Sequence, residues 1–503
     1  MRKIISLFKS NFNFTASVII LLTLGLYGLL INNINLWLDE IYSVLMAKDN
    51  FHDMWILLST EDSKPPLYYL YLKFVLMLFP KIYEIWGAHF SSCILLIVAQ
   101  VFAATRVKKD FGESVALWLI LILMLMPASL WLAFEVRTYM LSGLLMMMAL
   151  VYGISLIYKQ VWEDFIKFGI VSLLALYSHY YCALWLCFLY AFILLSMLKN
   201  KNDRHHLRYF LLTAVTVGIL FAPWLYVPLN TGQQISGKWY LHDGFVKFSW
   251  QFFTNPLNPE IFQSVYFIAT TFASSVFSFM LILGVCTQFS TKESGKLFKL
   301  GFYSFALTYL LLIILSYVVR PVVSARYLKI FSPVLYLCVA VVLTQFPKLR
   351  IPFLIAGVIG FVFTYADVRS VTFDNGYQIA VHNIRQFISK DKILLTYDNS
   401  NLFCEYYLPE YKCILITDGK GEILRKPQVL KNMPLYHHLP DENINFSLSI
   451  YSHPNNPNQC IPYLSNYRYG QNVTLCQHNF DEAKQAYQNS LYALEHLDST
   501  PVD

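Results

Sequence analysis

The chain has 503 residues, of which 56% are hydrophobic and only 14% are charged, with 35 Tyr and 39 Phe. A soluble protein of this length would have to expose large apolar patches, whereas a bilayer accommodates such a composition directly. The formal net charge of +7 comes from short basic clusters between apolar segments. This distribution argues against nucleic-acid binding and indicates topology signals. The composition therefore predicts a polytopic helical membrane protein.

The first apolar segment covers residues 14–31 and is too long for the hydrophobic region of a cleaved signal peptide. Basic residues precede it, so the positive-inside rule places the N-terminus in the cytoplasm and the following loop outside. Residues 67–79 are too short to cross a bilayer and contain Lys73, so we expect a re-entrant or interfacial helix. Further spans are expected at residues 86–105, 114–133, 139–158, 165–178, 182–198, 209–227, 263–288, 300–318, 331–346 and 351–367.

The expected total is about eleven spans, and the basic clusters test it. If residues 67–79 do not cross, the clusters at 106–109, 199–208, 292–299 and 348–350 all lie in the cytoplasm. If they do cross, the first two clusters fall outside, against the charge rule. We therefore expect an all-α multispanning membrane domain over residues 1–367.

Hydropathy falls after Asp367, and residues 368–503 are expected to form a small extracytoplasmic α/β domain. The pattern predicts helices at 378–389 and from a capping box at 479–482 to about 497, and strands at 392–397 and 413–417. An even number of cysteines in an oxidising compartment favours disulfides over a metal site, with the pairing left open. The cysteines concerned are Cys404, Cys413, Cys460 and Cys476.

Charged and titratable residues gather at span ends that map to the outer face, which indicates one extracytoplasmic site. They are Asp39, Glu40, Lys64, Glu135, Arg137, His179, Arg320 and Arg326. Several have simpler explanations: Glu135 and Arg137 as a local salt bridge, and His179 as an interfacial hydrogen-bonding residue. Two guanidiniums in the 320–326 loop suit a phosphate or diphosphate, although lipid head groups would also bind there.

The order of these motifs resembles the GT-C glycosyltransferases, most closely the dolichyl-phosphate-mannose–protein mannosyltransferases and their bacterial relatives. The resemblance covers about residues 1–370. It rests on Trp37-Leu38-Asp39-Glu40, Lys64-Pro65-Pro66-Leu67-Tyr68-Tyr69, Glu135-Val136-Arg137-Thr138-Tyr139, Ser178-His179-Tyr180-Tyr181 and Ala325-Arg326-Tyr327-Leu328. Many members of the superfamily carry His before the double proline. This chain has Lys64 there, as in the aminoarabinose transferases that modify lipid A. His89 stands where members usually carry Arg.

The resemblance implies transfer of a sugar from a polyprenyl-phosphate carrier to lipid A, a glycan or a protein by an inverting displacement outside the cytoplasm. Asp39 would act on the acceptor as general base, with Glu40 holding Asp39 or a metal; a divalent metal is left open. The expected donor-phosphate residues are Lys64, Arg137, Arg320 and Arg326. The candidate substrate-binding residues are Glu135, Tyr139, His179, Tyr180 and Tyr327.

The rival reading is a polytopic transporter or lipid flippase without transferase activity. Transporters place charges near the bilayer midplane on interrupted helices and tend to show repeated halves. Here the charges lie at one interface and no internal repeat is visible, so the sequence favours a transferase. A phosphoethanolamine-type transferase would need a large outer domain with metal-ligand clusters, which the C-terminal segment lacks. The expected location is a bacterial inner membrane, with membrane lipids and a lipid-linked sugar as partners and no nucleic acid.

Overall fold

The computed structural model describes most of the chain. The described residues are 11–32, 35–59, 64–199, 204–231, 264–289, 291–318, 322–323, 325–373, 376–390, 393–397, 400–416, 446–449, 460–466 and 471–477. The predicted capping box at 479–482 and its helix, and Arg320, lie outside these residues.

The chain divides into two compact units. The helical unit comprises Met1–Asn32 and Leu58–Val368, and the second unit comprises Asn33–Leu57 and Arg369–Asp503. The segment that carries Asp39 therefore clusters with the C-terminal part of the chain, although the sequence assigned it to the membrane domain. Hydropathy does not report this association, because it scores each segment by itself.

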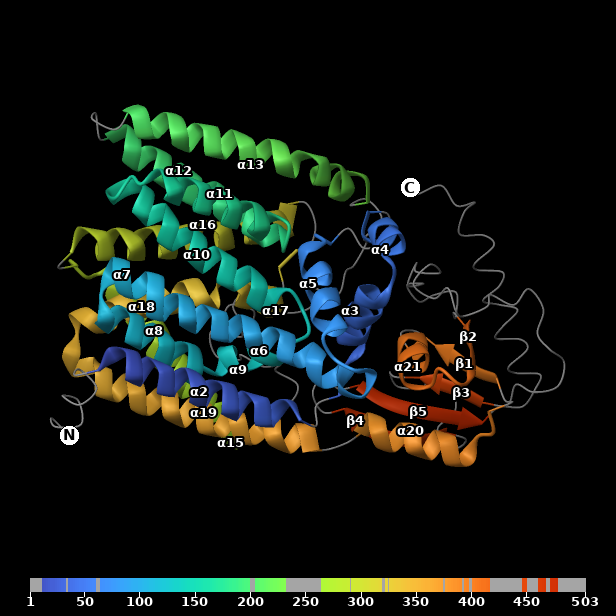
Figure 1. Cartoon of the computed structure of the whole chain (residues 1–503). Coiled ribbons are helices and arrows are strands. Elements are labelled where there is room, and N and C mark those ends of the chain that lie inside the picture. Colours follow the sequence, from blue (N-terminus) through green and yellow to red (C-terminus); the bar gives the residue numbers. More distant parts are fainter. Residues whose placement is uncertain are drawn as a thin grey trace. The chain divides into compact units, whose positions relative to one another are not determined.

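The helical unit consists mainly of apolar helices (Figure 1). Its longer helices are α2 (Phe12–Ile31), α6 (Glu84–Phe102), α8 (Glu113–Leu125), α10 (Tyr139–Tyr158), α11 (Trp162–Leu176), α12 (Tyr180–Lys199), α13 (Arg204–Thr231), α15 (Ser264–Val285), α16 (Lys292–Val318), α18 (Ser332–Gln345) and α19 (Arg350–Phe373). The shorter ones are α5 (Leu67–Met77), α7 (Lys108–Phe111), α9 (Pro127–Phe134) and α17 (Ala325–Leu328). Single turns are η2 (Lys81–Tyr83), η6 (Lys329–Phe331) and η7 (Pro347–Leu349), and η3 (Ala103–Val107) is a π-helical turn.

Nine helices of the described residues are long and apolar enough to cross a membrane, or ten if one bent pair counts as a span. The expected eleven spans are not confirmed, for two local reasons. The predicted span 114–133 is broken into α8 and α9, which meet at 70°, because Pro127 has no N–H to continue the helical ladder. The predicted span 165–178 is the 15-residue α11, which is shorter than a typical transmembrane helix.

The centre of the helical unit is formed by α10 and α18, most of whose residues are buried. Gly143 of α10 permits their close approach, because a Cβ there would lie 2.7 Å from Pro333 Cγ and 2.8 Å from the Ile330 carbonyl oxygen. The end of α10 that begins at Tyr139 is thereby packed against η6. This packing sets the position of the charged residues described below.

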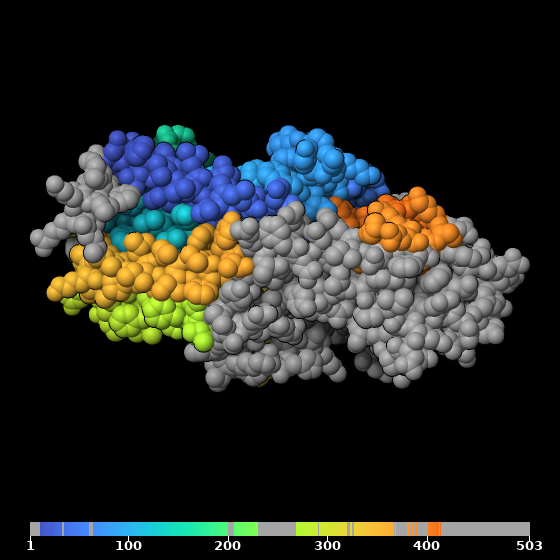
Figure 2. All heavy atoms as spheres, turned by 90° about the horizontal axis from the view of Figure 1, so that it is seen from below, coloured from blue at the N-terminus to red at the C-terminus, as the bar shows by residue number. Residues whose placement is uncertain are grey.

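One face of the helical unit is formed by α2, α19 and α15, which lie side by side (Figure 2). The rings of Tyr27 and Phe361 join α2 to α19, and Gly360 brings α19 against Ala273 of α15. The outward side chains are large and apolar, as lipid contact requires. They include Leu21, Leu22, Leu29, Ile355, Val358, Val362, Phe272 and Ile282.

The second unit contains a five-stranded sheet in the order β2-β1-β3-β5-β4. Strand β1 pairs in parallel with β2 and β3, whereas β5 is antiparallel to β3 and β4. The strands are β1 (Ile393–Tyr397), β2 (Lys412–Ile416), β3 (Phe446–Ser449), β4 (Cys460–Asn466) and β5 (Gln471–Gln477), and the helices are α3 (Leu38–Lys48), α4 (Phe51–Leu57), α20 (Gly376–Phe387) and α21 (Ser400–Tyr407). Helix α21 connects β1 to β2 and packs on both strands and on α3.

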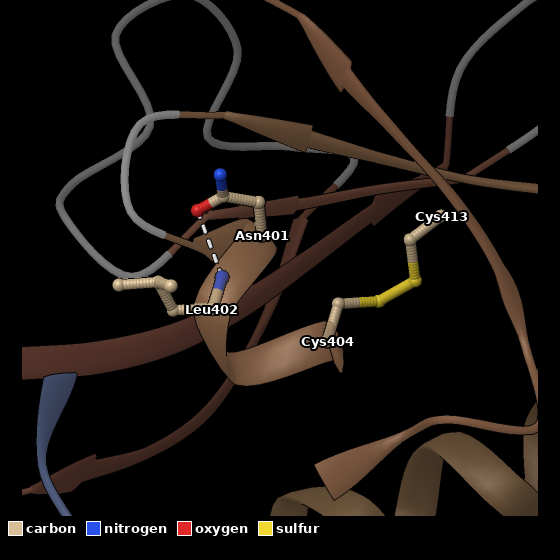
Figure 3. The surroundings of a disulfide bond; sticks show 4 residues. All are labelled: Asn401, Leu402, Cys404 and Cys413. Atoms are coloured by element: carbon tan, nitrogen blue, oxygen red, sulfur yellow. Dashed lines mark hydrogen bonds between the residues drawn. A yellow bond between two sulfur atoms is a disulfide. The ribbon is translucent and has the colours of Figure 1, made fainter. Parts of the chain in front are cut away.

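A disulfide joins Cys404 of α21 to Cys413 of β2 (Figure 3). Next to it, the Asn401 side-chain oxygen accepts the N–H of Leu402 at 2.8 Å in the first turn of α21. The prediction of at least one disulfide among the four C-terminal cysteines is confirmed. The backbone register also places Cys460 opposite Cys476 in the β4–β5 pair.

Candidate active site

Glu135 and Arg137 lie in the turn between α9 and α10 and are almost fully buried, with exposed fractions of 1% and 6%. The N–H of Arg137 donates to the Glu135 carbonyl oxygen at 2.8 Å. From α6, the Ser92 hydroxyl donates to the same carbonyl at 2.6 Å, and His89 Nδ1 donates to the Phe134 carbonyl at 2.5 Å. Polar side chains of α6 thus hold this turn through its backbone.

A second turn, between α11 and α12, carries His179. It is tied to the first, because the Thr138 hydroxyl donates to the Ser178 carbonyl at 2.8 Å. It is also tied to the Lys64-Pro65-Pro66 segment, because the N–H of Leu67 donates to the Tyr177 carbonyl at 3.0 Å. Three segments distant in sequence therefore converge around His179.

The imidazole of His179 is kept neutral by this environment. Withdrawal from water, followed by the nearby Arg137 and Lys64 cations, lowers its pKa to about 3. Its Nδ1 accepts the N–H of Tyr181 at 3.1 Å. In the neutral ring Nδ1 is therefore the unprotonated nitrogen and Nε2 carries the hydrogen. His179 is therefore a neutral side chain that can donate a hydrogen bond from Nε2, and it lies near the Arg137 and Lys64 cations.

Aromatic rings surround His179. Its ring centroid lies 5.0 Å from Tyr181, 5.7 Å from Tyr327 and 6.4 Å from Tyr139. Tyr139 in turn stacks on Trp131 at 5.3 Å. Such a wall provides flat apolar faces with polar edges, which suits contact with a sugar or a prenyl chain.

Two further cations, Arg326 and Lys329, approach these rings from α17 and η6. The Arg326 guanidinium carbon lies 5.6 Å from the Tyr327 ring centroid, and Lys329 Nζ lies 4.4 Å from that of Trp131. Lys329 is 4% exposed and interacts electrostatically with Glu135 and Arg326. Four basic residues of the helical unit, Lys64, Arg137, Arg326 and Lys329, thus lie near these rings or near Glu135.

Asp39 and Glu40 lie on the first turn of α3, in the second unit. The Glu40 carboxylate accepts the Trp37 N–H at 3.2 Å and forms a capping box. Glu40 is fully buried and Asp39 is half-buried. The observed contact of Glu40 is therefore with the backbone of its own helix.

The structure brings together Lys64 and Arg137, predicted for the donor phosphate, with His179, Tyr139 and Tyr327, predicted for substrate binding. Arg326 lies beside Tyr327, and Glu135 interacts with Lys329. Tyr180 is directed elsewhere, since its hydroxyl accepts Trp224 Nε1 at 3.2 Å. Arg320 lies outside the described residues. No group of three or more His, Cys, Asp or Glu side chains suited to a metal occurs within the described part of the chain.

The fold is similar to that of a protein of known structure, ArnT. ArnT from Cupriavidus metallidurans in the apo state aligns over 92% of this chain and 98% of its own at 11% identity, with a TM-score of 0.60. The same protein bound to undecaprenyl phosphate aligns over 91% and 97% at 12% identity, with a TM-score of 0.54. Residues 63–227 match the model of the dolichyl-phosphate-mannose-protein mannosyltransferase family. The chain has the GT-C glycosyltransferase fold. None of the curated protein sequences compared with it matches.

The resemblance seen in the motifs is thus confirmed at the level of the fold, and the apolar helices support an integral multi-pass membrane protein. Lys329 also lies near these rings, but it belongs to none of the sequence motifs and was not predicted. The available signal was its spacing, because a lysine three residues after Arg326 lies on the same side of a helical turn. In an apolar sequence such a lysine is usually interpreted as reaching toward the membrane surface.

Proposed function

We propose that the protein is a membrane glycosyltransferase that moves a hexose or pentose from a polyprenyl-phosphate carrier to lipid A, another glycan or a protein. The GT-C fold supports a transferase, and the similar ArnT structure contains undecaprenyl phosphate. The motif order supports a donor of the same chemical class here.

The observation that carries the proposal is the cation cluster around the neutral His179. Lys64 and Arg137 both act on that ring, and Arg326 lies beside Tyr327 in the same group of aromatic rings. A phosphate is attracted to such cations and accepts paired hydrogen bonds from a guanidinium. The aromatic wall beside the cluster suits the sugar or the first prenyl units.

In the proposed reaction an acceptor hydroxyl attacks the anomeric carbon from the face opposite the phosphate. The new C–O bond forms as the bond to the phosphate oxygen breaks, and configuration inverts. Asp39 takes the hydroxyl proton, and the polyprenyl phosphate leaves with the bonding electron pair. Lys64, Arg137 and Arg326 neutralise the charge that grows on the leaving oxygen, and Arg320 is assigned to the same phosphate. The Glu40 contact with Trp37 favours a role in holding the Asp39 helix.

The proposal places the site and the C-terminal domain on the extracytoplasmic face, with residues 1–367 as the membrane domain and 368–503 as a small α/β domain. The distribution of basic residues between spans supports this orientation. Residue types at the site do not distinguish the three acceptor classes. Mass spectrometry of lipid A, glycans and envelope proteins from cells with and without the gene would identify the acceptor by the sugar mass that is lost.

The test separates Asp39 from Lys64 in protein reconstituted with a polyprenyl-phosphate sugar. We expect Asp39→Asn to lower turnover by roughly two to four orders of magnitude with nearly unchanged donor affinity, because only the proton acceptor is removed. We expect Lys64→Ala to weaken donor binding and also slow transfer, since the charge on the leaving phosphate is greatest in the transition state. Weak donor binding in Asp39→Asn, or full activity in Lys64→Ala, would contradict these roles.

A further inference from the structure

The hydroxyl of Tyr407 makes two hydrogen bonds to the backbone of one residue, Leu36. It accepts the Leu36 N–H at 3.0 Å and donates to the Leu36 carbonyl at 3.3 Å. Leu36 is fully buried and immediately precedes Trp37, the N-cap of α3, and Asp39 follows two residues later. A side chain from the C-terminal part of the chain therefore holds the backbone at the point where the Asp39 helix begins.

Helix α21 also contacts the other end of α3. Lys48, in the last turn of α3, places its Nζ 5.9 Å from the ring centroid of Tyr406. Asp49, the C-cap of α3, lies close enough to Glu405 to add to the effect of burial in raising the pKa of Glu405 to about 7. The last turn of α21 thus lies close to both ends of α3.

Helix α21 is itself firmly fixed in the second unit. The Cys404–Cys413 disulfide ties it to strand β2 (Figure 3). Arg385 of α20 donates from Nη2 to the Tyr407 carbonyl at 3.3 Å and from Nε to Glu410 at 2.5 Å. The Tyr407 ring packs edge-on against Tyr406 with centroids 4.9 Å apart. The Tyr407 hydroxyl, which is hydrogen-bonded to Leu36, therefore belongs to a helix that is held in place by several contacts.

We propose that Tyr407 is a positioning residue for Asp39, and that α21 serves to hold the acceptor-side helix α3 in its reactive place. This inference rests on the proposed function, since it assumes that Asp39 acts on the acceptor. It assigns a catalytic purpose to the C-terminal part of the chain. A displacement of about 1 Å at a reacting group can cost roughly a hundredfold in rate. Hydrogen bonds to the backbone three residues before Asp39 are therefore expected to affect the rate through the position of Asp39.

The test uses full-length Tyr407→Phe, which keeps the ring and removes only the hydroxyl. Tyr411→Phe is the matched control, because the Tyr411 hydroxyl donates to the Ile388 carbonyl at 2.8 Å and does not touch α3. Amide hydrogen exchange of a peptide covering residues 36–41 should quicken by roughly fivefold or more in Tyr407→Phe and stay unchanged in Tyr411→Phe. Unchanged exchange in Tyr407→Phe would overturn the inference whatever the activity.

The second readout is kinetic. We expect Tyr407→Phe to lower kcat by roughly ten- to a hundredfold with little change in KM for the donor lipid. Combined with Asp39→Asn it should add little further loss, because residues that act as a unit are not additive. A multiplied loss in the double variant, or wild-type turnover in the single one, would overturn the positioning role. Failure of wild-type protein to transfer any sugar would instead overturn the proposed function, and the exchange measurement would still decide whether Tyr407 holds α3.

Discussion

The protonation state of His179 is determined by burial and by charges from segments that are distant in the sequence. An isolated histidine in an interfacial turn gives no sign of its protonation state, and its ordinary pKa would make it a pH switch near neutrality. Arg137 and Lys64, together with removal from water, keep it neutral down to about pH 3. His179 is therefore suited to donate a hydrogen bond to a bound anion at every physiological pH.

This shift predicts how stability depends on pH. The folded-state pKa, about 3, lies below the ordinary value near 6.5, so between these pH values the unfolded chain binds a proton that the folded chain does not. The contribution of His179 is fully present above pH 6.5 and is lost as pH falls. We expect the drop in Tm between pH 7.5 and pH 5 to be smaller for His179→Asn than for the wild type. An identical drop in both would show that His179 does not titrate abnormally.

The stabilities of Lys329 and Glu135 are expected to depend on each other, because both side chains are buried and interact electrostatically. Lys329→Met leaves a buried carboxylate with less compensation, which costs about 3–5 kcal/mol of unfolding free energy. The double variant Glu135→Gln/Lys329→Met should recover part of that loss. Lys167→Met breaks the exposed pair with Glu163 and should cost below about 1 kcal/mol. Equal losses in the single and double variants would mean that the two charges do not depend on each other.

The sequence could single out the candidate site residues that the structure brings together, because each belongs to a short local motif at the end of an apolar segment. It did not predict Lys329, which carries no motif, or Tyr407, which acts on a residue 371 positions earlier in the chain. Nor did it predict that Glu40 caps its own helix. A carboxylate in a capping box and a carboxylate in an active site look the same until the backbone donor is seen.

At the scale of elements, helix positions followed from hydropathy but the break between α8 and α9 did not. An apolar stretch is scored the same whether or not a proline interrupts it, and Pro127 is tolerated here because it occupies the first turn of α9. Helix α5 was expected not to cross, and its 11 residues agree with that expectation.

The contact between α10 and η6 can be tested at Gly143. A Cβ there would press on the Ile330 carbonyl and the Pro333 ring, neither of which can rotate away. We expect Gly143→Ala to cost about 1–3 kcal/mol and to weaken donor binding by displacing Lys329. Gly28→Ala on α2, where no atom lies within 4 Å of the new Cβ, should be neutral or slightly stabilising. Wild-type thermal stability of Gly143→Ala would show that η6 can shift without cost.

For the molecule as a whole, the basic turns of the helical unit gather at one end. Lys108 Nζ donates to Asn13 Oδ1 at 3.0 Å, Lys159 pairs with Asp110 at 2.6 Å, and the Tyr158 hydroxyl donates to the Lys292 carbonyl at 3.2 Å. Arg350 reaches Ser114 at 3.4 Å at the same end. The start of α2 therefore lies beside the end of α6, which requires that the intervening α5 does not cross. Helix α10 spans from this end to Tyr139, so the His179 cluster lies at the opposite end.

From this distribution of basic residues, the positive-inside rule predicts that the basic end lies in the cytoplasm. Thiol labelling of single cysteines in intact cells and inverted vesicles tests it, in a background without the five cysteines that are free among the described side chains. Ser63→Cys, next to Lys64, should react only from outside, and Asn202→Cys, within the basic 199–208 cluster, only from the cytoplasmic side. Labelling of both from the same side would mean that α5 crosses the membrane after all. The candidate donor site would then not lie on the extracytoplasmic face, where the proposed reaction requires it.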